Sequence, residues 1–286
     1  MATDSFQIRS MTEAHLPHCV RLSEEAGWNQ QHADWGFLAK AGSEYNLVAT
    51  LDDQILGTVT ALPYSDRFLW IGMMLVHVSY RRQGIGKHLL SKLMENADPS
   101  CCFGLDATPL GEKLYDVLGY KKMANLHRYG RPFNGKKDST STSSNCRKIT
   151  VMDLDRIHSF DQDICGVDRS SVLKYLHRSA PDYAWLAESD QQLTGYLMGR
   201  PGRLADHLGP MVAASADVAL TLLRAALASS SKTFVIDVFD YQKEWIATLN
   251  DLGFEVQRPL YRMFRGDPIT TLSGPKIFAI AGPELG

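Results

Sequence analysis

The sequence lacks the features that would place it outside ordinary globular proteins. No apolar run approaches the about 20 residues that a membrane-spanning helix needs, so we expect no membrane partner. The formal net charge is only −2, which gives no basic field that would recruit nucleic acid. The first residues, Met1–Phe6, have neither the basic nor the apolar segment of a secretory signal.

Cysteine is scarce and unclustered. There are five, an odd number, and only two are adjacent: Cys19, Cys101, Cys102, Cys146 and Cys165. No Cys-x-x-Cys or Cys/His spacing is typical of zinc, so no metal is predicted. Free thiols indicate a reducing compartment, and we expect a cytoplasmic protein. The 286 residues, with a globular composition, are enough for about two domains.

The most informative stretch runs from Trp70 to Glu95. Ile71–Val78 is an almost unbroken apolar run, which predicts a buried central strand over 70–79. The sequence Arg-Arg-Gln-Gly-Ile-Gly follows at 81–86. Apolar residues then return at the spacing of one helical face: Leu89, Leu90, Leu93 and Met94. This order predicts a strand, a glycine-bearing turn and an amphipathic helix.

The turn has the chemistry of an anion site. Gly84 and Gly86 lack Cβ atoms, so the backbone there turns sharply and lets a ligand approach closely. The first amides of the following helix have no partner within the helix and favour an anion, of which a diphosphate is the natural candidate. Arg81, Arg82 and Lys87 add positive charge. A dinucleotide site is disfavoured, because the third glycine of Gly-x-Gly-x-x-Gly is replaced by Leu89.

Arg-x-x-Gly-x-Gly between an apolar strand and a helix resembles the pyrophosphate loop of the GNAT superfamily of acyl-CoA-dependent N-acyltransferases. A hairpin over 45–62, a strand over 101–108, a helix over 109–118 and two short strands over 120–131 follow the GNAT order. Leu114-Tyr-Asp-Val-Leu-Gly-Tyr120 also resembles a GNAT segment. The resemblance implies acetyl-CoA as cosubstrate and these binding residues: Val76, Val78, Arg81, Arg82, Gln83, Gly84, Ile85, Gly86 and Lys87.

The second half repeats the first. Gly57 and Gly195 take the same place in two predicted hairpins, and Gly119 and Gly253 each end a helix. The predicted fold is α/β, with two tandem GNAT-like domains that each have a mostly antiparallel sheet flanked by helices. We place the first domain at 1–131, a flexible Ser/Thr-rich linker at 132–146 and the second domain at 147–286. The second lacks the pyrophosphate loop.

The resemblance also implies a catalytic role for Tyr115, a phenol that would protonate the departing thiolate; packing in the core is the alternative. Asp106 ends a strand beside the cleft and serves equally well as a base, a ligand for the amine or a helix cap. The base stays open among several groups: His77, Glu24, Glu25, His32, Asp206–His207 or a chain of waters. Trp28, Trp35 and Tyr64 are either pocket walls or, more commonly for such residues, core.

The predicted function is acetyl transfer from acetyl-CoA to a primary amine, and a small molecule suits the near-neutral charge best. Two alternatives remain. One is a protein or peptide N-acetyltransferase that uses its second domain for docking. The other is a non-catalytic acyl-CoA sensor. The sequence leaves a monomer and a homodimer equally open.

Overall fold

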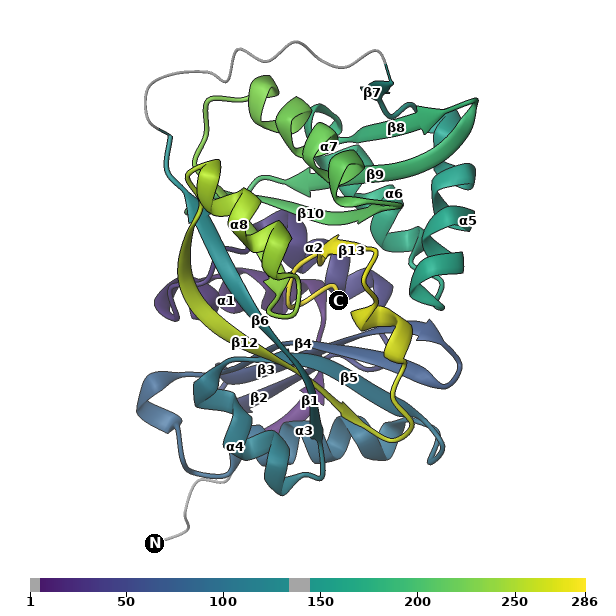
Figure 1. Cartoon of the computed structure of the whole chain (residues 1–286). Helices are drawn as coiled ribbons and strands as arrows, with labels where there is room; N and C mark the ends of the chain where they lie inside the picture. Colours follow the sequence, from purple (N-terminus) through teal and green to yellow (C-terminus); the bar gives the residue numbers. More distant parts are fainter. Residues whose placement is uncertain (1–5, 134–144) are drawn as a thin grey trace, which may run out of the picture. The chain divides into compact units, whose positions relative to one another are not determined.

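The computed structural model describes residues 6–133 and 145–286, which divide into two compact units. The first unit comprises the chain up to Lys121 together with Met263–Pro268. The second comprises Lys122–Arg262 and Ile269–Gly286. Each unit combines a mixed sheet with helices (Figure 1), which confirms the predicted α/β class.

In the sheet of the first unit, the strands from β1 to β4 are antiparallel neighbours. Its strands lie in the order β1 to β5, and β4 and β5 are the parallel neighbours. The end of β12 follows β5. The strands are β1 (Gln7–Ser10), β2 (Leu47–Leu51), β3 (Gln54–Ser65), β4 (Phe68–Val76), β5 (Cys102–Ala107) and β12 (Glu255–Arg265).

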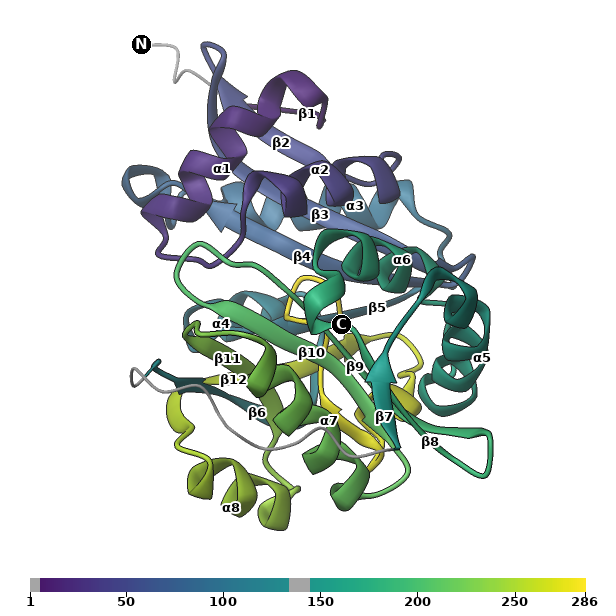
Figure 2. The ribbon, with the colours of Figure 1, turned by 90° about the horizontal axis from the view of Figure 1, so that it is seen from above.

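Four α-helices cover the two faces of this sheet. The helices α1 (Leu16–Glu25) and α2 (His32–Ala41) lie in front of β2 and β3 in Figure 2. The opposite face carries α3 (Ile85–Asn96), because a Cβ on Gly57 of β3 would lie 3.2 Å from Ile85 and Leu89. Helix α4 (Pro109–Val117) follows β5.

The core of the first unit is rich in aromatic side chains, and one of them, Phe264, comes from β12 near the end of the chain. Trp35 and Trp70 are fully buried, and Phe264 lies 6.2 Å from Phe68 and 6.4 Å from Trp70 between ring centroids. Trp35 donates its indole N–H to the Ser23 hydroxyl at 3.2 Å, so it is a core residue and not a pocket wall. Tyr64 is also buried.

The second unit repeats this plan. Its strands lie in the order β7-β8-β9-β10-β11-β6-β12, and β10 and β11 are the parallel neighbours. A further strand, β13 (Ile277–Ala279), pairs with β10. The other strands are β6 (Lys121–Arg131), β7 (Cys146–Lys148), β8 (Trp185–Ser189), β9 (Gln192–Arg200), β10 (Asp206–Ala213) and β11 (Phe234–Phe239).

Successive residues of β9 show which helices cover each face of this second sheet. A Cβ on Gly195 would lie 2.9 Å from Val218 of α7 (Ala216–Ser229), whereas Tyr196 contacts Asp161 of α5 (Leu154–Cys165). Because neighbouring strand residues point to opposite faces, α7 and α5 lie on opposite faces. The remaining helices are α6 (Ser170–Ser179) and α8 (Lys243–Asp251).

The equivalence of the two halves holds at the glycines. Gly57 pairs with Ala49 in one hairpin and Gly195 with Ala187 in the other. Gly119 and Gly253 have φ values of +84° and +82°, the left-handed conformation that favours glycine after a helix. The predicted repeat is therefore present in the structure.

Two details differ from the prediction. The segment 121–131 is one continuous strand, β6, and not two short strands, because it pairs with β11 without interruption from Leu126 to Arg131. The compact units also do not separate at residue 131, since most of β6 belongs to the second unit and the end of β12 to the first. Most of the predicted linker, 134–144, lies outside the described residues.

Among the residues that the structure describes, no helix is both long and apolar enough to span a membrane.

Candidate active site

The two parallel strands of the first unit part from each other halfway along. Phe68, Leu69 and Trp70 pair with Cys102, Phe103 and Gly104, and the pairing ends there. The last residues of β4 therefore have β3 as their neighbour on one side and no ladder to β5 on the other. The result is a divergence between two strands, bordered by backbone groups that do not pair with the opposite strand.

A bulge in β4 lies at the start of this divergence. The register to β3 shifts between Thr58 and Thr60, and Met73 has a φ of +46°. A buried methionine rarely adopts this conformation, so the surrounding structure must hold it. The Thr58 hydroxyl does so, because it donates a hydrogen bond to the Met73 carbonyl at 2.8 Å. Sequence analysis missed this bulge, since nothing in the apolar run distinguishes Met73.

The predicted loop follows the end of β4. The strand ends at Val76, earlier than the expected residue 79, and Val78 lies in the 3₁₀ turn Val78–Tyr80. Gly84 has a φ of +84° and immediately precedes α3, as its glycine identity predicted. Residues 81–84 are exposed, whereas Ile85 is buried and fixes the start of the helix.

Two loop side chains are bonded back to the strand end and to the turn that follows it. Arg81 donates its Nε–H to the Val76 carbonyl at 3.1 Å. Gln83 donates its amide to the Ser79 carbonyl at 3.2 Å. Arg82 has a φ of +64°, and both it and Lys87 are exposed. Three cationic residues thus lie within four positions of the first residue of a 12-residue helix, at whose N-terminus unpaired amides attract an anion.

The loop, the end of β4 and helix α4 meet around Gly86. A Cβ at this position would lie 3.2 Å from Met74 of β4 and from Leu114 of α4, and 3.7 Å from Val76. Tyr115 follows Leu114 and is buried. The structure therefore brings together residues from the two motifs that the sequence analysis quoted separately.

Tyr115 has the properties of a protonated donor. Burial alone raises the pKa of its phenol far above the usual value near 10, so the hydroxyl stays neutral at physiological pH. Its ring packs edge-on against Tyr120, with centroids 5.6 Å apart. Among the described residues we find no hydrogen-bond partner for the Tyr115 hydroxyl.

Asp106 lies on β5 and is half-buried. The helix that follows has Thr108 at its N-cap position and Pro109 in its first turn. Asp106 is therefore not the N-cap residue of α4. Its roles as a base or as a ligand for the amine stay predictions.

Of the groups considered as a base, the structure brings two together. His77 Nε2 lies 3.6 Å from a Glu25 carboxylate oxygen, and His77 Nδ1 accepts the Ser79 amide N–H at 3.3 Å. These contacts assign the proton to Nε2 and leave no bare lone pair on the ring. Glu24, Glu25 and His32 are all exposed.

The remaining pair, Asp206 and His207, lies in the second unit. Asp206 accepts the Tyr183 hydroxyl, and His207 Nε2 contacts Asp237 at 3.1 Å.

The equivalent divergence in the second unit is filled by the chain itself. The strands β10 and β11 pair only over Asp206–His207 and Phe234–Val235. Strand β13 then pairs with β10, and Ile280 donates its amide N–H to the Asp237 carbonyl of β11 at 3.1 Å. The turn after β10 offers Ser215 as the N-cap and no arginine. Sequence analysis did not identify this pairing of β13 with β10.

Within residues 6–133 and 145–286, no group of three or more His, Cys, Asp or Glu side chains is arranged to hold a metal ion.

Comparison with known families finds the same domain twice. Residues 8–112 match the Acetyltransferase (GNAT) family, and residues 157–279 match an Acetyltransferase (GNAT) domain. The chain is 24% identical over 253 residues to an uncharacterized N-acetyltransferase, YitH, from Bacillus subtilis (strain 168), covering 87% of each chain. It is 26% identical over 238 residues to holothin acyltransferase from Pseudoalteromonas sp. (strain SANK 73390), covering 82% of this chain and 79% of that one.

A solved structure shares the whole fold. A candidate acetyltransferase from Pyrococcus horikoshii superposes with a TM-score of 0.82 at 20% identity, over 100% of this chain and 98% of the other. At this identity the similarity establishes the fold alone.

Proposed function

Because the chain is a tandem member of the GNAT family, and so an N-acyltransferase that uses an acyl-CoA cosubstrate, we propose that its first unit moves an acetyl group from acetyl-CoA to the primary amine of a small molecule. One observation carries the proposal. The first unit combines a strand divergence with a Gly84/Gly86 loop, whereas β13 occupies the equivalent divergence of the second unit. One acyl-CoA site per chain follows from this difference.

The residues around the loop suit the polar end of this cosubstrate. Arg81, Arg82 and Lys87 would neutralise the diphosphate, and the amides from Gly84 to Lys87 would bind its oxygens. The backbone groups of Val76 and Val78 would bond the pantetheine arm. The Val76 carbonyl accepts the Arg81 side chain in the structure, so we infer that Arg81 exchanges this bond for one with the diphosphate.

The bulge at Met73 is suited to bind the thioester carbonyl oxygen of the acyl group. It interrupts the β3–β4 ladder where the strands diverge, so backbone N–H groups there are candidates for stabilising the oxyanion that forms during acyl transfer.

Tyr115 would donate a proton or a hydrogen bond to the departing thiolate, because its raised pKa keeps the phenol protonated. For the opposite proton transfer we propose Glu25, oriented by the Nε2–H of His77 at 3.6 Å. In this arrangement the carboxylate takes the proton from the ammonium group, and His77 is a positioning residue.

The acyl group and the amine are tested together. Purified protein is supplied with acetyl-CoA or longer acyl-CoA thioesters and a panel of small primary amines, and thiol release is followed with a chromogenic disulfide. We expect amine-dependent release with acetyl-CoA. Release only with longer thioesters would contradict the acetyl assignment. Release only with peptides would favour a protein acetyltransferase, and calorimetric binding without any release would favour a sensor.

A further inference from the structure

A row of charged side chains crosses five adjacent strands of the second unit. In the β6–β11 ladder Arg128 is directly opposite Asp237, and in the β9–β10 ladder Arg200 is directly opposite His207. Residues directly opposite in an antiparallel pair point to the same face. Arg258 of β12, the strand next to β6, and Glu284 complete this group, which we call the charged row.

Three contacts hold the row together. Arg128 donates two hydrogen bonds to the Asp237 carboxylate, at 2.8 and 2.7 Å. Asp237 also accepts the His207 Nε2–H at 3.1 Å, and Arg200 pairs with Glu284. Apart from Arg258, every member of the row is less than one-tenth exposed.

The charges of the row do not balance. Three guanidinium groups face two carboxylates, and His207 adds no charge because burial lowers its pKa. Arg258 is the unmatched cation, since among the described residues it makes no ion pair within 4.0 Å. Burial and the charge of Arg128 lower the pKa of Arg258 by more than the carboxylates of Asp237 and Glu284 raise it. A partly buried cation of this kind favours an anionic partner.

Two buried acceptors in the row also lack a hydrogen bond. They are Nδ1 of His207 and Oε2 of Glu284, on side chains that are 1% and 2% exposed. Since Asp237 only accepts hydrogen bonds, the His207 proton lies on Nε2 and Nδ1 carries a bare lone pair. Buried polar atoms without partners are rare in native proteins, and each suggests a group that completes it.

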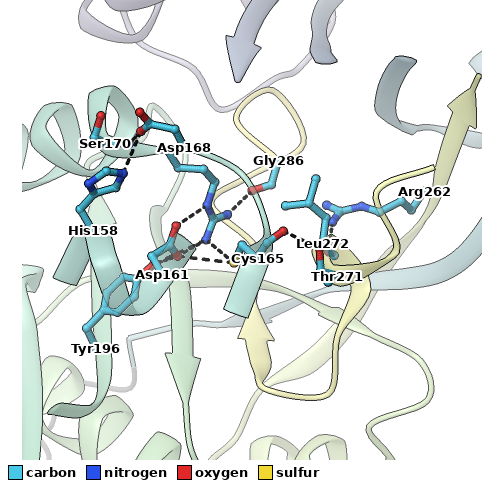
Figure 3. Close-up of polar contacts among 11 residues, drawn as sticks. His158, Asp161, Cys165, Asp168, Ser170, Tyr196, Arg262, Thr271, Leu272 and Gly286 are labelled. Atoms are coloured by element: carbon cyan, nitrogen blue, oxygen red, sulfur yellow. Dashed lines mark hydrogen bonds and ion pairs between the residues drawn. The ribbon is translucent and has the colours of Figure 1, made fainter. Parts of the chain in front are cut away.

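A second buried network, around Asp161 and Arg169, lies on the same side of the sheet and has no unmatched charge of this kind. Asp161 accepts hydrogen bonds from Arg169 Nε and Nη2 and from the Tyr196 hydroxyl, and Arg169 Nη1 donates to the Gly286 carbonyl (Figure 3). Its role is to fasten the segment 269–286 to α5. The charged row is therefore distinctive in having one cation and two acceptors left over.

We propose that the charged row of the second unit binds a small carboxylate that carries an adjacent hydrogen-bond donor, as in an amino acid or a hydroxy acid. Arg258 would bind the carboxylate, and Oε2 of Glu284 and Nδ1 of His207 would accept from the amino or hydroxyl group. Arg258 is the only member of the row with substantial exposed surface, so a ligand enters beside it. All residues of this site belong to the second unit, and the proposal does not depend on acyl transfer by the first.

The test measures binding to the full chain without acyl-CoA. Glycine, L-serine and L-lactate are compared with acetate, which lacks the donor, and ethanolamine, which lacks the carboxylate, by calorimetry and thermal unfolding up to about 10 mM. We expect glycine, L-serine or L-lactate to bind and to raise the midpoint temperature of unfolding. Acetate and ethanolamine should each bind at least about tenfold more weakly.

Variants locate the site. Arg258→Gln should weaken binding by about tenfold or more and Arg258→Lys by less. Arg224→Gln, which changes an exposed arginine on α7, should have no effect. Acetyl-CoA affinity, measured separately, should be unchanged in all three, so failure of this proposal is distinguishable from failure of the first. No binding of glycine, L-serine or L-lactate, equal binding of acetate, or full affinity in a folded Arg258→Gln protein would each overturn the proposal.

Discussion

Arg81 donates its Nε–H to the carbonyl oxygen of Val76 at 3.1 Å, across the turn between β4 and α3. This bond links the two parts of the proposed acyl-CoA site, the strand end and the cationic loop. A carbonyl at the end of β4 is thereby satisfied by a side chain, whereas the interior carbonyls of the strand are satisfied by its neighbour. The loop is consequently held against the strand before any ligand arrives.

The first prediction concerns this arginine. Arg81→Ala should weaken acetyl-CoA binding about three- to tenfold, because one exposed cation near the diphosphate is lost. Affinity should also depend less steeply on salt than in the unchanged protein. Calorimetry at two ionic strengths measures both effects. If the salt dependence is unchanged, Arg81 does not contact the diphosphate.

Gly86 provides a steric prediction. Gly86→Val would place branched atoms where Met74 and Leu114 already lie 3.2 Å from a Cβ, and it would block close approach to the loop backbone. We expect acetyl-CoA affinity to fall about tenfold or more, or about 1.4 kcal/mol. Gly36→Ala in α2 is the matched control, because a Cβ there meets nothing within 4 Å. Unaltered affinity in a folded Gly86→Val protein would move the site elsewhere.

Tyr115→Phe separates chemistry from binding. Loss of the phenol should lower kcat by about 10²-fold while the Kd for acetyl-CoA stays the same, because the hydroxyl acts on the leaving group. Tyr120→Phe is the comparison, since it removes a hydroxyl from the buried ring packed against Tyr115. Equal rates in the two variants would assign Tyr115 to packing.

The lowered pKa of the buried Asp237 carboxyl group leads to a prediction of how the stability of the fold depends on pH. Burial alone would raise its pKa, but the Arg128 guanidinium and hydrogen bonds from Arg128 and His207 outweigh burial and hold the pKa well below the usual value. A lowered native pKa stabilises the fold fully above the unfolded pKa near 3.9, and this contribution is lost as the pH falls below it. The lowered pKa of His207 acts in the same direction below about pH 6.5.

Asp237→Asn tests this linkage. The variant should lose about 3–5 kcal/mol at pH 7, because the charge of Arg128 stays buried without its carboxylate. Its free energy of unfolding should then fall less between pH 5 and about pH 3 than that of the unchanged protein. Urea unfolding across this range measures both quantities, with exposed Asp251→Asn as the control. Parallel pH profiles for Asp237→Asn and the unchanged protein would refute the assignment.

Local chemistry explains what the sequence could predict. Gly84, Gly119 and Gly253 have the left-handed φ values for which glycine is suited, and both predicted hairpins are present. The features it missed are set by distant partners. Met73 adopts its unusual φ where the β3–β4 register shifts. Strand β13 pairs with β10, some 65 residues earlier in the chain, and Phe264 packs in the core of the first unit. Periodicity carries no information about such pairings.

The exchange of strand ends has a consequence for the gene. Expressed alone, the residues before the predicted linker would leave Phe68 and Trp70 without Phe264, and the residues after it would leave β11 without β6. Neither product would be a self-sufficient module. The two halves of this chain therefore depend on being translated as a single polypeptide.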